Sequence, residues 1–189
     1  MTRIVLAGEC DKHDFVLMMA SLLHAHTGKE AYIVTDKEER YRYFQENIPG
    51  VTVTGTGLPE DAEVALYDWH NRLPDDIGEA KLVFASDYSR GSLENLDLLM
   101  DDQAPDKVLI IEEECNIGLR YMEKRYPTAS LIIDYMSSPE RKIEWSHQGT
   151  ISYKVDKDFA AAINECLVDQ ADVPRADIKK LWQFARKRG

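Results

Sequence analysis

Short runs of consecutive apolar residues, separated by segments with helical periodicity, constrain the fold of this chain more than any other feature. The stretches KLVFAS (81–86), KVLIIE (107–112) and SLIIDY (130–135) are apolar almost throughout. A strand with one face in water alternates apolar and polar residues, whereas a continuous apolar run needs cover on both faces. Strands and helices that alternate in this way form right-handed βαβ crossovers. The pattern predicts an α/β fold: a doubly wound, mostly parallel sheet of about seven or eight strands with helices on both faces.

The apolar runs set the predicted strands, and polar N-cap residues mark the predicted helices. Strands are expected at Arg3–Ala7, Ala31–Thr35, Val51–Thr54, Val64–Tyr67, Leu82–Ser86, Val108–Ile111 and Leu131–Asp134, with a weaker one at Ile151–Val155. Side chains of Asp, Ser and Asn accept hydrogen bonds from the free N–H groups at a helix start. Helices are therefore expected to begin at Asp14, Ser92, Asn116 and Asp156.

Length, charge and cysteine content exclude several classes of protein. With 189 residues the chain is expected to form one α/β domain over residues 1–170, followed by a basic amphipathic helix over residues 171–189. The net charge of −11 argues against direct nucleic-acid binding, because phosphates need a positive surface. Cys10, Cys115 and Cys166 are scattered without CxxC spacing, which indicates reduced thiols rather than a metal site. No apolar run approaches the roughly 20 residues of a membrane span, and no signal-peptide pattern precedes the first strand. We therefore expect a cytoplasmic protein.

The loop after the first predicted strand, GECDKHD (8–14), lies where a nucleotide-binding α/β protein places its phosphate loop. Such a loop needs glycines so that backbone N–H groups can converge on phosphate, a lysine, and a Ser or Thr for magnesium. Gly8 and Lys12 are present, but carboxylates surround them and His13 occupies the hydroxyl position. Like charges repel in that position, so the chemistry of the loop does not suit a nucleoside triphosphate.

Several segments, taken in order, resemble the MinD/ParA family (SIMIBI class) of P-loop ATPases. The segment RIVLAGECDKHDFVLMMASLL falls where that family has its strand, deviant Walker A loop and first helix. Lys12 aligns with the phosphate-loop lysine, but the family's second, signature lysine has no counterpart. AYIVTDK is similar to the second strand, with Asp36 at the acidic position, and EVALYDWHN is similar to the Walker B strand, which Asp68 ends.

The resemblance continues through KLVFASDYSRGSLENLDLLM, KVLIIEEECNIG and ASLIIDYMSSPERKIEWSHQG, and covers about residues 1–170. It implies a vestigial nucleotide site of Gly8, Lys12, Asp36 and Asp68, with no catalytic residue, no metal site and no cofactor. It further implies a non-catalytic scaffold or positioning protein, acting through protein–protein contacts, as a homodimer, in localisation of an assembly or in segregation. The alternative is a nucleotide-dependent switch ATPase that handles ATP and Mg²⁺ with an atypical loop.

Other interpretations of these residues stay open. For the scaffold we expect Lys12→Ala to leave stability and any partner binding nearly unchanged. Lys12 could also be a solvated loop lysine paired with Glu9 or Asp14. Asp68–His70 could support acid–base chemistry, although adjacent residues on a strand point apart. Glu112–Cys115 could be a metal-binding cluster, but a solvated acidic loop is the simpler interpretation. A receiver-like acidic site and an unrelated small-molecule enzyme of the same fold class are further alternatives.

The last residues form a basic stretch on an acidic protein. Ile178, Leu181, Trp182 and Ala185 follow helical spacing and form one apolar stripe. This segment resembles the membrane-targeting tail of MinD-type proteins. It can pack back on the domain, bind a partner protein, or lie on an anionic membrane surface. The residues expected to meet a partner or a membrane are Ile178, Lys179, Lys180, Leu181, Trp182, Arg186, Lys187 and Arg188.

Overall fold

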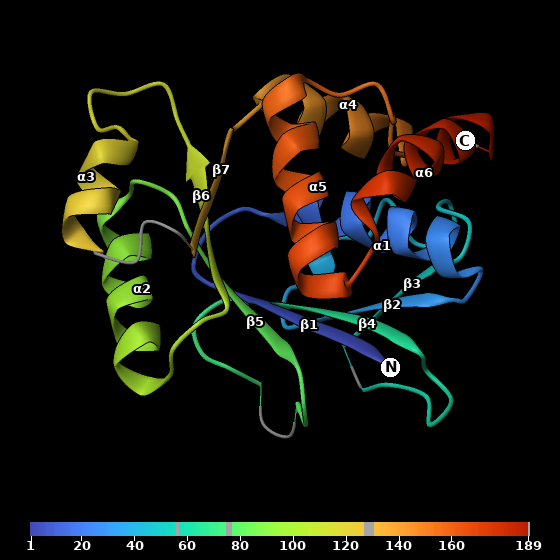
Figure 1. Ribbon diagram of the computed structural model, residues 1–189, viewed down its shortest axis with the longest axis horizontal. Helices are drawn as coiled ribbons and strands as arrows, with labels where there is room; N and C mark the ends of the chain where they lie inside the picture. Colours follow the sequence, from blue (N-terminus) through green and yellow to red (C-terminus); the bar gives the residue numbers. More distant parts are fainter. Residues whose placement is uncertain (56, 75–76, 127–130, 189) are drawn as a thin grey trace.

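Seven parallel strands form one central sheet, with helices on both faces (Figure 1). The computed structural model describes residues 1–55, 57–74, 77–126 and 131–188. The strands are β1 (Thr2–Ala7), β2 (Ala31–Thr35), β3 (Val51–Thr54), β4 (Val64–Trp69), β5 (Lys81–Ser86), β6 (Lys107–Glu112) and β7 (Ile132–Met136). The helices are α1 (His13–Thr27), the 3₁₀ turn η1 (Glu38–Arg40), α2 (Arg90–Asp102), α3 (Leu119–Arg125), α4 (Pro139–Gln148), α5 (Lys157–Ala171) and α6 (Arg175–Arg188).

The strand order β3-β2-β4-β1-β5-β6-β7 places β1 at the centre of the sheet. β1 pairs with β4 on one side and with β5 on the other, and all pairs in the sheet are parallel. The chain builds β2, β3 and β4 on one side of β1 and then β5, β6 and β7 on the other, so this centre is the switch point of the sheet. Parallel strands end at one common edge, which brings the loop after β1 beside the ends of β2 and β4.

Two apolar cores lie on the two faces of the sheet. On one face, α1, α4, α5 and α6 cover the strands, and their buried residues include Phe15, Trp145, Phe159 and Trp182. On the other face, α2 and α3 pack with residues such as Leu96. Figure 1 shows α3 beside the β6–β7 end, away from α5 and α6. The predicted doubly wound α/β fold is confirmed, with seven strands that are all parallel.

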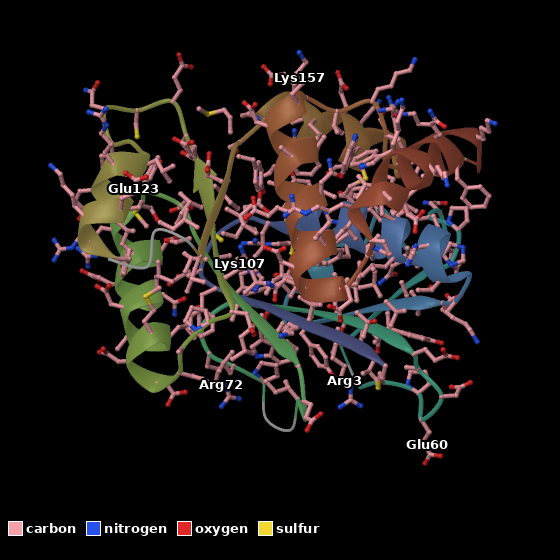
Figure 2. All side chains as sticks on the ribbon, in the orientation of Figure 1. Arg3, Glu60, Arg72, Lys107, Glu123 and Lys157 are labelled. Carbon is pink, nitrogen blue, oxygen red and sulfur yellow. The ribbon has the colours of Figure 1, made fainter. Side chains whose placement is uncertain are left out.

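An ion-pair cluster attaches α5 to the sheet. Lys107, labelled in Figure 2, lies at the start of β6 and is largely buried. Its ammonium lies 3.1 Å from a carboxylate oxygen of Glu165 and 2.8 Å from one of Asp169, both on α5. These contacts raise the pKa of Lys107 in spite of burial, which by itself lowers it.

The eighth expected strand is wrong: no strand forms at Ile151–Val155. This segment lies between α4 and α5, and its apolar side chains pack against the core on the α1 face. The hydroxyl of Tyr153 makes a hydrogen bond with that of Ser21 on α1. The alternating apolar residues therefore contact a helix rather than a neighbouring strand.

Three of the four expected N-caps are also wrong. Asp156 caps α5, its carboxylate accepting from the N–H of Phe159. Helix α2 begins one turn early, because the Ser89 hydroxyl accepts from the N–H of Ser92. Gly118 rather than Asn116 precedes α3, and Lys12 rather than Asp14 precedes α1. Asp14 lies inside the first turn of α1, where one carboxylate oxygen accepts from the N–H of Phe15 and the other from Arg141.

The described helices include none that is both long and apolar enough to cross a membrane.

Close backbone packing requires glycine at residue 8. Gly8 has a φ of +152°, and a Cβ at this position would lie 1.8 Å from the carbonyl oxygen of Ala85 on β5. The Gly8 N–H donates to the carbonyl of Trp69 at 2.9 Å. The glycine thus lets the chain leave β1 between its two neighbouring strands.

We predict that Gly8→Ala lowers the free energy of unfolding by about 3 kcal/mol or more, because the methyl group meets backbone and the φ is unfavourable. Urea unfolding measures the loss. The matched control is Gly28→Ala, where φ is +69° but no atom lies within 4 Å of the added Cβ. This control should lose only about 1 kcal/mol, and an equal loss in both variants would contradict the packing argument.

Candidate functional site

The ammonium of Lys12 lies in the protein interior at the carboxyl edge of the sheet. It donates to the carbonyls of Gly8 at 2.9 Å and Trp69 at 3.1 Å, and lies 2.8 Å from Oδ1 of Asp68. Lys12 and Asp68 are both 0% exposed. A lysine ammonium has three N–H donors, and three acceptors surround this one. The expectation of a solvated lysine paired with Glu9 or Asp14 is therefore wrong.

Asp68 connects this ammonium to the segment after β2. Its second oxygen, Oδ2, accepts from the hydroxyl of Tyr41 at 2.6 Å. Burial alone would raise the pKa of Asp68, but the neighbouring Lys12 outweighs it and the pKa is lowered. Burial, followed by the charge of Asp68, holds the pKa of Tyr41 well above its usual value. Asp68 is thus an anion that one cation and one phenol enclose.

A second pair, Asp36 and His70, lies next to this centre. Nδ1 of His70 is 2.7 Å from Oδ1 of Asp36, and the backbone N–H of His70 points to the other carboxylate oxygen at 3.4 Å. Burial lowers the pKa of His70, and the charge of Lys12 lowers it further. Nε2 of this buried imidazole has no partner among the described residues. His70 therefore pairs with Asp36, while its neighbour Asp68 faces Lys12.

Side chains from other elements bind the carbonyls of the loop after β1. The guanidinium of Arg40 donates to the carbonyl of Cys10 at 3.2 Å, and Lys142 donates to that of Asp11 at 2.7 Å. The hydroxyl of Ser92 donates to the carbonyl of Glu9. In a phosphate loop the N–H groups face the ligand, whereas in this loop the carbonyls face donors of the protein.

Two N–H groups of the same loop are also bonded internally. The N–H of Glu9 donates to the side-chain oxygen of Asn95 on α2 at 3.1 Å, and that of Cys10 donates to the carbonyl of Gly8 at 2.9 Å. Asn95 in turn donates to the carbonyl of Asn71 after β4 at 3.1 Å. The loop after β1 is thus tied to α2 across the switch point of the sheet.

The carboxylate of Asp11 is paired with His13 of the same loop and with cations from outside it. Asp11 lies 2.6 Å from Nδ1 of His13, 3.4 Å from Arg40 and 3.3 Å from Lys142. Burial opposes ionisation of Asp11, but His13, Lys142 and Arg40 together lower its pKa. The loop therefore keeps its negative charge, and no phosphate is needed to neutralise these cations.

Asp14 anchors helices α4 and α5 to α1. Both Nε and Nη2 of Arg141 donate to one carboxylate oxygen of Asp14, at 3.0 and 2.9 Å. Nη1 of the same guanidinium donates to Asp156 at 2.5 Å, and the guanidinium carbon lies 3.8 Å from the ring centre of Phe159. A partly aromatic, partly anionic socket of this kind suits Arg and not Lys.

Three of the four residues expected at a vestigial nucleotide site, Gly8, Lys12 and Asp68, are connected by direct contacts of the Lys12 ammonium. Asp36 instead binds His70, which follows Asp68 by two residues. Sequence reasoning missed a second set of residues that completes the network: Arg40, Tyr41, Asn95, Arg141 and Lys142. Only the Ser-Pro-Glu start of α4 was a visible signal, since Ser138 caps that helix and Pro139 follows.

The described cysteines show no metal chemistry. Cys10 and Cys166 are buried, and burial raises the pKa of each to about 12. Cys115 is exposed. Among the residues that the structure describes, no group of three or more His, Cys, Asp or Glu side chains is arranged to hold a metal ion.

Three cavities lined by described residues lie away from this network. One of about 440 Å³ lies at the start of β1, where Figure 2 labels Arg3. Another of about 510 Å³ runs beside β3, and one of about 540 Å³ lies at α3. None of the three is lined by Lys12, Asp36 or Asp68. The network is therefore a set of internal contacts rather than the wall of one of these cavities.

The apolar stripe of the tail packs against the domain. Leu181, Trp182 and Ala185 of α6 are buried in the same core as α1 and α5. The indole N–H of Trp182 donates to Asn164 on α5 at 2.7 Å. Ile178 is partly buried against this core. Basic residues remain at the surface of α6, namely Lys179, Lys180, Arg186 and Lys187, and Arg188 lies at the helix end.

This chain was compared with protein families and with curated proteins. A scan against models of protein families and a search of curated proteins both found no match for this chain.

We predict that Lys12→Met lowers the free energy of unfolding by about 3–5 kcal/mol, because it leaves the buried Asp68 without its cation. Urea unfolding measures the change. Lys12→Met combined with Asp68→Asn removes both charges and should recover part of the loss.

The matched control is Lys180→Met, whose side chain is 82% exposed, and it should change stability by less than about 0.5 kcal/mol. A Lys12→Met protein as stable as this control would contradict the internal role of Lys12.

We predict that Trp182→Ala costs about 3–5 kcal/mol of stability, because it removes a buried indole and its hydrogen bond to Asn164. Thermal and urea unfolding of the full chain provide the measurement. Gln183→Ala changes an exposed neighbour on the same helix and serves as control. Equal stability of the two variants would show that α6 does not depend on this packing.

Proposed function

We propose that this chain is a non-catalytic scaffold or positioning protein that acts through protein–protein contacts. It would retain the α/β architecture of MinD/ParA-like ATPases without their nucleotide chemistry. A protein partner, including a second copy of the chain, is then its ligand, in localisation of an assembly or in segregation. The proposed biological setting rests on the resemblance to that family. The proposed loss of catalysis rests on the geometry of the site.

The observation that supports the proposal most is that the Lys12 ammonium already has partners within the protein. A phosphate-binding lysine must be free to reach the ligand, but this ammonium donates to the carbonyls of Gly8 and Trp69 and lies 2.8 Å from Oδ1 of Asp68. Moving it to a ligand would leave Asp68 as an unpaired buried anion, at a cost of about 3–5 kcal/mol. Nucleotide binding would have to offset that cost before any affinity remained.

The charge of the loop supports the same conclusion. Glu9 is exposed beside α2, and Asp11 is held ionised by its neighbours. Phosphate brought to this loop would meet two carboxylates and carbonyls that already accept hydrogen bonds. Ser and Thr side chains suited to Mg²⁺ are absent from residues 8–14.

The tail supports contact with a protein more than contact with a membrane. Its apolar stripe packs in the core, so a membrane contact would rely on Lys and Arg side chains and on Phe184, which is 40% exposed. The electrostatic part of such binding loses affinity with salt.

Isothermal titration calorimetry with ATP and ADP, with and without Mg²⁺, tests the proposal. The full chain should give no binding heat up to millimolar nucleotide. Lys12 is unsuitable as the control because it supports the fold. Arg40→Ala, which removes a cation above the loop, is the better variant for locating any signal.

Micromolar ATP binding that Arg40→Ala weakens would overturn the proposal. It would support the nucleotide-dependent switch, and ATP hydrolysis would be the next measurement.

A further inference from the structure

The β6–β7 end of the sheet carries a surface that the described residues leave partly exposed. β7 is an edge strand, paired with β6 alone among the described strands. Ile133 and Tyr135 point into the α1-face core, so Asp134 and Met136 point to the face shared with α2 and α3. Met136 is 43% exposed, which shows that this helical layer does not cover the end of β7.

Apolar side chains are exposed around α3 as well. Ile117 is 41% exposed and Tyr121 is 42% exposed. A cavity of about 540 Å³ is lined by residues 116–121 and Lys124. Glu123, labelled in Figure 2, lies on the same helix. Large apolar side chains gathered beside a cavity and a sheet edge are typical of an interaction surface.

A pair of carboxyl groups without a cation lies on this face. Glu112 ends β6 and accepts a hydrogen bond from the hydroxyl of Tyr88 at 3.0 Å. Burial, reinforced by Glu112, raises the pKa of Asp134 to about 6. No ion pair joins either carboxylate to a Lys, Arg or His within the described part of the chain. A cation supplied from outside would therefore relieve their repulsion.

Helix α3 carries cations that are similarly unmatched. Arg125 pairs with Asp97 on α2, but Arg120 and Lys124 are exposed and form no ion pair with a described residue. The β6–β7 side of the domain thus presents unpaired cations on α3, and carboxylates without an ion pair at the end of β6 and in the middle of β7. In two copies related by a two-fold axis, the cations on α3 of each copy can face the carboxylates of the other.

We propose that this α3–β7 face, comprising Glu112, Ile117, Arg120, Tyr121, Lys124, Asp134 and Met136, is where a second copy of the chain binds. Two copies related by a two-fold axis would place Arg120 and Lys124 of each copy against Glu112 and Asp134 of the other. Ile117, Tyr121 and Met136 would be buried between them.

Charge complementarity favours a second copy as the occupant. Chains with a net charge of −11 repel one another at long range, so association needs a face on which opposite charges meet. An unrelated partner would have to supply both signs in the matching arrangement, whereas a second copy does so by symmetry. This inference rests on the proposed function, for which it supplies the partner.

Sedimentation equilibrium of the full chain across a concentration series tests the proposal. The wild type should dimerise, and added salt should weaken the dimer. Lys124→Glu and Asp134→Lys should each raise the dissociation constant at least about tenfold, because each homodimer then contains two like-charge contacts.

The equimolar mixture of the two variants is the decisive sample. In a heterodimer of Lys124→Glu with Asp134→Lys, both contacts again join opposite charges, so dimerisation should return to within about threefold of wild type. Misfolding of either variant could not produce this recovery. Lys180→Glu makes the same charge change on exposed α6 and should leave the dimer unaffected.

A wild type that is monomeric throughout, a dimer indifferent to both reversals, or a mixture no stronger than its components would overturn the proposal. None of these outcomes concerns nucleotide. A monomer that fails to bind ATP would overturn this interface alone, and a dimer that binds ATP would overturn the non-catalytic function alone.

Discussion

The buried ion pair between Lys12 and Asp68 is the contact on which the arrangement of the carboxyl edge depends. It joins the loop after β1 to the end of β4, and the same ammonium binds the carbonyls of Gly8 and Trp69. A buried charge of either sign alone would be strongly unfavourable, so each residue requires the other. Because this pair lies at the switch point of the sheet, it occupies the centre at which a doubly wound protein would bind its ligand.

The surrounding contacts extend this pairing in three directions. Asp68 reaches Tyr41 after β2, Ser92 and Asn95 of α2 bind the backbone of Glu9, and Lys142 of α4 binds that of Asp11. Elements from both faces of the sheet therefore converge on one loop. The same network that stabilises the loop also occupies the Lys12 ammonium and the N–H groups of Glu9 and Cys10, which are groups that a phosphate loop offers to its ligand.

Local pattern sufficed for the strands but not for the details at their ends. Seven apolar runs were predicted near their observed positions, because cover on both faces leaves a signature within a few residues. Asp156 was identified as an N-cap because its carboxylate binds an N–H only three residues further along the chain. The strand predicted at Ile151–Val155 was wrong because alternating apolar residues show only that one side of the segment is buried. That side can pack against a helix as well as lie in a sheet. The N-cap prediction at Asp14 was wrong because α1 begins one residue earlier, at His13; the binding of the Asp14 carboxylate by Arg141, far along the chain, left no local pattern.

The amino-acid sequence by itself determined the fold class, the acidic character of the loop and the residue types gathered around it. Whether Lys12 faces solvent, a ligand or the interior was decided only by tertiary structure. Parallel pairing of β1 with β4, in which Leu6 lies opposite Asp68, brings the carboxylate to the lysine. The apolar stripe of α6 was likewise visible in sequence, and only packing on α1 and α5 decided its use. The burial of Lys12 and its pairing with Asp68 depend on contacts between segments that are distant in the chain. The periodicity of the sequence does not reveal such contacts.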